Sequence, residues 1–160
     1  MAENNAADAQ DSKEKPILRM QKMYIKDLSL ENPNSPDIFR ASQSSEPNVD
    51  LNLQLNNRKL GDDHWEVALE INAKVVTKEE TPRVLFILEI EHAAVFFLKH
   101  IPEQHMSMVL GVECPTLLFP FTRQIISQIS VDGGFMPFLM EPVNFMALFQ
   151  NAQKNKEGSN

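Results

Sequence analysis

The chain has 160 residues, a formal net charge of -7 and a sequence pI of about 5.1. This length suits one domain, and the acidic balance argues against nucleic acid and anionic membrane surfaces as partners, because both require a basic face on the protein. A lone Cys114 excludes an internal disulfide and a Cys-rich zinc site, and the absence of a signal peptide and of a long apolar run predicts a cytoplasmic protein without direct membrane insertion.

The first expected element is a long strand that follows a polar tail. Residues 1–15 cannot bury enough apolar surface to offset chain entropy, so we expect a disordered tail there. The strand is expected from Ile17 to Glu31, where the alternation is imperfect and a β-bulge or partial burial of both faces would explain it. One parity holds Leu18, Met20, Tyr24, Leu28 and Leu30, and the other holds Met23 and Ile25.

Residues 32 to about 47 are rich in Pro, Ser and Asn, which predicts a connection without regular structure. A loop of this length in a compact domain is usually functional or mobile. Phe39 is one of its few apolar residues. Both a packing anchor and a binding role remain open for this side chain.

Three further strands are indicated by strict alternation of apolar and polar residues. The first covers Val49 to Asn56, and a turn is expected from Asn57 to Asp63. The next two cover Trp65 to Val75 and about Val84 to Leu98, which predicts one antiparallel sheet with an apolar and a water-facing side. Acidic residues on the water-facing side, either as a solvated face or as a binding surface, would be Asp27, Glu31, Glu66, Glu70, Glu89 and Glu91.

The helices follow the strands. Residues 100–108 suggest a short helix or a lid-like loop, and a strongly apolar helix is expected to begin at Cys114 and end at Gly133-Gly134. Pro120 would be a second start or a kink. A helix so apolar in so small a chain suggests burial on more than one side, and therefore an oligomer. An extended stretch 135–140 precedes a last helix that Asn144 is expected to cap.

The sequence gives no positive case for an enzyme, a cofactor or a metal site. The four histidines lack metal-ligand spacing, and His92 is interpreted as a structural residue within a strand. Cys114 with His105 could in principle form a nucleophile pair, although a cysteine before a proline at a helix start is usually structural. The chain has no Gly-rich phosphate loop and no Gly-x-Ser-x-Gly elbow.

Three motifs resemble those of one family, in the same order. Cys114–Arg123 reads Cys-Pro-Thr-Leu-Leu-Phe-Pro-Phe-Thr-Arg, and 141–149 contains Pro-Val-Asn-Phe-x-Ala-Leu-Phe. Near the start, 24–34 reads Tyr-x-Lys-Asp-x-Ser-x-Glu-x-Pro-Asn. Together they resemble SecB, the bacterial protein-export chaperone family.

The resemblance implies an α+β fold, in which a four-stranded antiparallel sheet has one face covered by two main helices and four copies form a dimer of dimers. It implies a SecB-like chaperone domain over residues 16–152, with a flexible C-terminal tail at 153–160. The implied function is that of an ATP-independent holdase, which keeps unfolded precursor proteins translocation-competent and delivers them to the SecA motor. A general or toxin–antitoxin-linked holdase without a SecA role is the alternative.

The resemblance also assigns candidate sites. SecA contact falls on Asp27, Glu31, Ile87 and Glu89, the last two through a gap placed near Pro82. The client groove falls on the apolar residues Phe39, Phe121, Phe145, Leu148 and Phe149. Two departures affect details: Ser44 and Ser45 lie where some relatives have an aromatic residue, and the C-terminal tail is less acidic than in some relatives.

Overall fold

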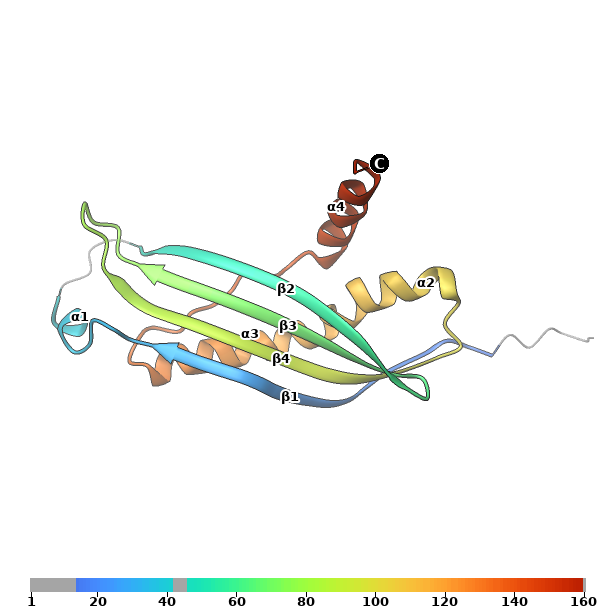
Figure 1. Cartoon of the computed structure of the whole chain (residues 1–160). Helices are drawn as coiled ribbons and strands as arrows, with labels where there is room; N and C mark the ends of the chain where they lie inside the picture. The colour runs from blue at the N-terminus through green and yellow to red at the C-terminus, as the bar shows by residue number, and fades with distance from the viewer. Residues whose placement is uncertain (1–13, 42–45, 160) are drawn as a thin grey trace, which may run out of the picture.

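A four-stranded antiparallel sheet forms the body of the protein, which is described here from a computed structural model that covers residues 14–41 and 46–159. The strands are β1 (Ile17–Glu31), β2 (Asn48–Gly61), β3 (His64–Val76) and β4 (Val84–Lys99), in the spatial order β1-β4-β3-β2. The expected sheet is confirmed, and the helices lie against one of its faces (Figure 1). Most of the tail expected at 1–15, together with Ser44 and Ser45, falls outside the described residues.

Two β-bulges explain the imperfect alternation of β1. The register of β1 against β4 shifts between Met20 and Lys22 and again between Ile25 and Asp27. Each bulge adds one residue and therefore exchanges the two faces of the strand. Met23 consequently faces the helices. Tyr24 faces the opposite side, although its even position in the sequence would place it with Leu18 and Met20.

The sheet has a helix face and an open face. On the helix face lies most of the core, including Phe96, Leu88, Leu69 and Ile71, each no more than 1% exposed. The open face carries the intervening side chains of each strand and no helix (Figure 1). This alternation follows from the two-residue period of a strand, which places one apolar side chain toward the core at every second position.

One helical rod runs through three contiguous segments. These are α2 (Glu103–Met108), the π-helix η1 (Val109–Glu113) and α3 (Cys114–Asp132). Pro120 lies inside α3, and Gly133 closes it, as expected. α3 lies against the helix face, where Leu118, Thr122 and Ile126 are fully buried.

Several boundaries differ from those expected. Residues 57–61 continue β2, because they remain paired with β3 down to His64, so the expected turn shrinks to Asp62–Asp63. The connection after β1 contains the short helix α1 (Asp37–Arg40). The last helix, α4 (Phe145–Glu157), begins at the predicted cap, where the backbone N–H of Ala147 donates to Asn144 Oδ1, and residues 153–157 of the expected tail are helical.

None of the helices in the described ranges combines the length and apolar character needed to span a bilayer.

α4 leaves the body of the protein past the β2 edge of the sheet (Figure 1). Its first residue, Phe145, is nevertheless buried and packs edge-on against Phe119 of α3, with ring centroids 5.9 Å apart. The base of α4 is therefore part of the core, and its remainder is exposed.

Candidate functional site

Acidic side chains gather on the open face at the end where β1 finishes. Asp27 pairs with Glu91 of β4, and Glu91 pairs with Glu70 of β3, so three carboxylates stand side by side across three strands. Like charges directly opposite one another destabilise a sheet. A cationic partner would relieve this repulsion, which makes the region a candidate binding surface. We name it the acidic half, and its members are Asp27, Glu31, Asp50, Glu70, Glu89 and Glu91.

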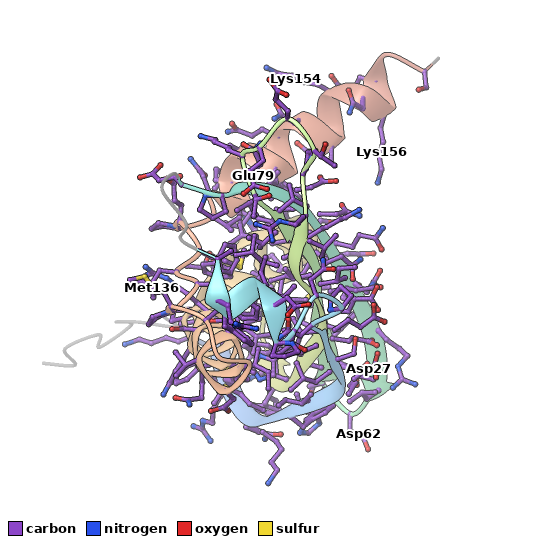
Figure 2. All side chains as sticks on the ribbon, turned by 90° about the vertical axis from the view of Figure 1, so that its left-hand side faces the viewer. Asp27, Asp62, Glu79, Met136, Lys154 and Lys156 are labelled. Atoms are coloured by element: carbon purple, nitrogen blue, oxygen red, sulfur yellow. The ribbon has the colours of Figure 1, made fainter. Side chains whose placement is uncertain are left out.

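The structure brings the four predicted SecA positions together on this surface. Glu31 pairs directly with Ile87, and Glu89 lies two residues along β4 opposite Ser29, in the row next to that of Asp27. Figure 2 shows Asp27 on the side of the sheet that faces away from α3. Glu70 and Glu91 complete the surface; strand alternation placed them on the same face, but only the register puts them in the row of Asp27.

Glu66 does not belong to this exposed acidic group, contrary to the expectation from alternation. It is 7% exposed, because side chains from both edge strands cover it. The Tyr24 hydroxyl donates to Glu66 Oε2, Lys26 Nζ lies 3.1 Å from Oε1, and Arg58 Nη2 lies 3.5 Å from Oε1. The hydrogen bond from Tyr24 and these two cations lower the pKa of Glu66, while burial and Glu66 itself raise the pKa of Tyr24 to about 12.

A second candidate surface is an apolar groove on the helix side, between β2 and α4. We name it the α4 groove; it is an open pocket of about 470 Å³. Its lining comes from β2, α2, η1 and α4 and includes Leu53, Leu55, Phe145, Leu148, Phe149 and Ala152. The groove faces an uncovered part of the sheet, since Val49 and Leu51 on the same face of β2 are each 43% exposed.

Phe149 fixes α4 at this place. A Cβ atom at Gly111 would come within 2.9 Å of Phe149 Cδ2, so the ring rests directly on the backbone of η1. The glycine is required here because any side chain would displace the ring. Leu53 and Leu55 were not among the predicted groove residues; their alternation showed which face they occupy, but not that α3 leaves them uncovered.

The five predicted client residues do not share one groove within the chain. Phe145, Leu148 and Phe149 line the α4 groove, although Phe145 is only 3% exposed and serves mainly as core. Phe39 is 47% exposed and lies near Phe135, with ring centroids 5.2 Å apart, on α1 at the far end of the sheet from α4 (Figure 1). It both packs and remains accessible, so neither alternative for it is eliminated.

Phe121 lines a third surface, between α3 and β1. This pocket of about 400 Å³ also includes Met23, Ile125 and Ile129. Leu117, Phe121 and Val131 are all exposed on the outer side of α3. The apolar face predicted for this helix is therefore wider than the sheet can cover, which supports the expectation of a further covering chain.

The two residues considered for catalysis differ in exposure, because His105 is exposed and Cys114 is not. Cys114 is fully buried, and burial followed by the nearby Glu113 carboxylate raises the pKa of its thiol to about 12. Such a thiol stays protonated at neutral pH and is a poor nucleophile, which argues against the cysteine-enzyme hypothesis. Among the residues that the structure describes, no group of three or more His, Cys, Asp or Glu side chains is placed to hold a metal ion.

His92 is a buried structural residue, as interpreted from the sequence. It is 3% exposed, and its Nδ1 lies 2.7 Å from the hydroxyl oxygen of Thr122 on α3. This contact joins the centre of β4 to the middle of α3. Burial lowers the pKa of the imidazole, because removal from water disfavours the charged form.

The free energy of unfolding is expected to fall as the pH drops below about 6.5. Below this pH the unfolded chain protonates His92 more readily than the folded chain does, so the unfolded state binds more protons. The slope of the loss is at most about 1.4 kcal/mol per pH unit, the limit for a single proton. Urea titrations between pH 7.5 and 5.5 measure it. His92→Gln should flatten the dependence and the exposed control His105→Gln should not; equal slopes in all three proteins would contradict the assignment.

This chain is similar to known proteins over nearly its whole length. The family described as preprotein translocase subunit SecB matches residues 11–156. The protein-export protein SecB of Desulfotalea psychrophila is 64% identical over 157 residues, which cover 98% of this chain and 97% of the relative. The protein of the same name from Magnetococcus marinus is 42% identical, with coverage of 98% and 95%.

The fold also resembles a solved structure. A SecB-like chaperone of Mycobacterium tuberculosis, in complex with a peptide from an antitoxin, superposes with a TM-score of 0.63 and 12% sequence identity. The match covers 79% of this chain and 90% of that one. At this identity the likeness shows a common fold.

Proposed function

The chain belongs to the SecB family of protein-export chaperones, and we propose that it binds unfolded precursor proteins in the cytoplasm, holds them without ATP and transfers them to the SecA motor. SecB proteins are non-enzymatic chaperones. The observation that carries the proposal is that the two faces of one sheet differ in chemistry. The helix side offers apolar grooves, and the open side offers a carboxylate surface.

The α4 groove supports client binding. Its side chains are mainly aliphatic and aromatic, and it lies beside exposed Val49 and Leu51 on the same face of β2. An unfolded segment that covers these side chains would remove apolar area from water, at about 25 cal/mol per Å². Such contacts need shape and apolarity rather than a sequence motif, so one groove can accept many clients.

The acidic half supports transfer to SecA. Asp27, Glu31 and Glu89 stand on the sheet face that no helix covers. Charged groups on such a surface accelerate encounter with an oppositely charged partner and fix its register. Because clients occupy the helix side, a motor on the open side could bind the loaded chaperone without first displacing the client.

Exposed apolar surface and unpaired strand edges support a homotetramer formed as a dimer of dimers. β1 and β2 are the two edges of the sheet, and β1 contributes 15 residues of edge. Edge pairing between copies would satisfy its free backbone groups. The outer side of α3, with Leu117, Phe121 and Val131 exposed, would then be covered by the helices of a second dimer.

The purified protein is expected to suppress aggregation of a urea-denatured secretory precursor without ATP, at about one tetramer per client. Light scattering on dilution of the denatured client measures this, and size exclusion with multi-angle scattering should give four chains. Unchanged aggregation at molar excess would refute the holdase function. Retained holding with no SecA binding would favour the alternative, a general or toxin–antitoxin-linked holdase.

A further inference from the structure

The open face is divided into two regions of opposite charge. The acidic half occupies the end near Glu31, where Lys74 lies among the carboxylates in the row of Ile87 and Asp50. Most of the other cations of this face gather at the opposite end, which we name the basic half. Its members are Arg19, Lys22, Lys26 and Arg58. Lys22 lies in the same row as Val95, Glu66 and Arg58, and Arg19 lies one row further toward the start of β1.

Within this basic half, Glu66 is the carboxylate that the cations engage. Lys26 and Arg58 both contact Glu66, and Lys26 also approaches Glu91 at 3.7 Å. Arg19 and Lys22 have no carboxylate within ion-pair distance among the residues described in the structure. In a chain of net charge -7, these four cations outnumber the Glu66 carboxylate on this part of the sheet face and give it a local positive charge. Asp62 and Asp63 lie beside it, in the turn between β2 and β3.

The two halves are continuous. Along β4, the row of Lys22 meets Val95 and the row of Ser29 meets Glu89, which puts roughly 20 Å between their centres at about 3.3 Å per residue. The row between them holds Ala93 and Ala68, both small and buried, beside Tyr24. No bulky side chain from β3 or β4 therefore separates the acidic half from the basic half.

We propose that the open face binds a charge-segregated segment of SecA in one direction, with its basic part on the acidic half and an acidic part on the basic half. This inference rests on the proposed function, since it takes the acidic half as the motor's docking surface. A segment reversed end for end would place like charges together at both halves, which costs affinity at each. The basic half thus selects the orientation of the bound motor.

Lys22→Glu is the decisive variant, because two interpretations predict changes of opposite sign. If net charge alone attracts a basic partner, an additional carboxylate on an already acidic chain should tighten SecA binding. If both halves of the face bind parts of opposite charge, Lys22→Glu should weaken SecA binding about tenfold. Arg19→Glu should act in the same direction. Isothermal titration with SecA at several salt concentrations measures both the affinity and its salt dependence.

Lys59→Glu is the matched control. Lys59 is exposed on the same strand as Arg58, but it pairs with Trp65 and so belongs to the helix face. The charge change is identical, and its SecA affinity should stay within about twofold of the parent protein. Equal affinities of Lys22→Glu and Lys59→Glu, or tighter binding by Lys22→Glu, would overturn the inference.

Two further measurements separate the possible failures. Asp27→Lys should weaken SecA binding about tenfold whatever the basic half does, so its unchanged affinity would overturn the proposed transfer to SecA itself. Sedimentation with phosphatidylglycerol vesicles tests a lipid partner. If Lys22→Glu abolishes vesicle binding while SecA affinity stays unchanged, the basic half contacts membrane and the present inference is wrong.

Discussion

Replacing both Asp27 and Glu89 with lysine is expected to weaken SecA binding by about a hundredfold or more while client holding persists. The two residues occupy neighbouring rows of the acidic half, so a partner that spans these rows meets both. Each reversal removes an attraction and adds a repulsion, and 1.4 kcal/mol at each position corresponds to tenfold in affinity. Titration of SecA into the variant measures the loss.

The control for this variant is Glu80→Lys, which makes the same change of charge in the turn between β3 and β4, outside the sheet face. It should bind SecA nearly as well as the parent chain. Aggregation assays on all variants report client holding. If the double variant lost both activities together, the separation of the two functions between the two faces would be wrong.

Leu148→Asp is expected to reduce client affinity by roughly ten- to a hundredfold, since burying a leucine side chain contributes about 1.5–3 kcal/mol and the charge must also be desolvated. Leu148 lines the α4 groove and is 47% exposed, so the change should leave the fold intact. The concentration of chaperone that halves client aggregation measures the effect. SecA affinity should not change.

Gln150→Asp provides the comparison for Leu148→Asp. It introduces the same charge at an exposed position two residues along α4, outside the residues that line the groove. Its holding activity should match that of the parent protein. Equal activity of the two variants would show that clients bind elsewhere, for example at Phe39 or on the surface around Phe121.

Strand alternation predicted most of the sheet, because a half-buried strand must repeat every two residues. It predicted the first strand to the residue and suggested a bulge, yet it could not place Tyr24. A single bulge would have moved the rest of β1 to the wrong face, whereas the second one restores it after Ile25. Odd and even positions in the sequence do not show how many bulges a strand contains, so the contact of Tyr24 with Glu66 could not be predicted.

Burial of Glu66 was missed for a related reason. A glutamate at a water-facing position normally stays solvated, and only the register shows that Tyr24, Lys26 and Arg58 from three separate positions converge on it. The acidic half, in contrast, was largely predictable, since strand alternation placed all its members except Asp50 on one face. The sequence motifs suggested its role, and the register shows its shape.

The client residues were assigned by the family resemblance, and their role stays a prediction. Helical spacing identifies an apolar face but does not say which neighbour covers it, so it could not show how Phe39, Phe121 and Phe149 are placed relative to one another. They lie on three surfaces, because α1, α3 and α4 meet the sheet at different places (Figure 1). Leu53 and Leu55 line the α4 groove only because α4 stands beyond the edge of β2, a position that local sequence does not determine.

The π-helix between α2 and α3 determines how far α2 is rotated about the helix axis relative to α3. Its wide turn accommodates one extra residue, and each residue of a helix advances the direction of side chains by about 100°. Removing one residue from 109–113 would make the rod a continuous α-helix and swing α2 about its axis relative to α3. Gly111 would then no longer lie beneath Phe149. The direction of α4 therefore depends on the length of the five-residue π-helix.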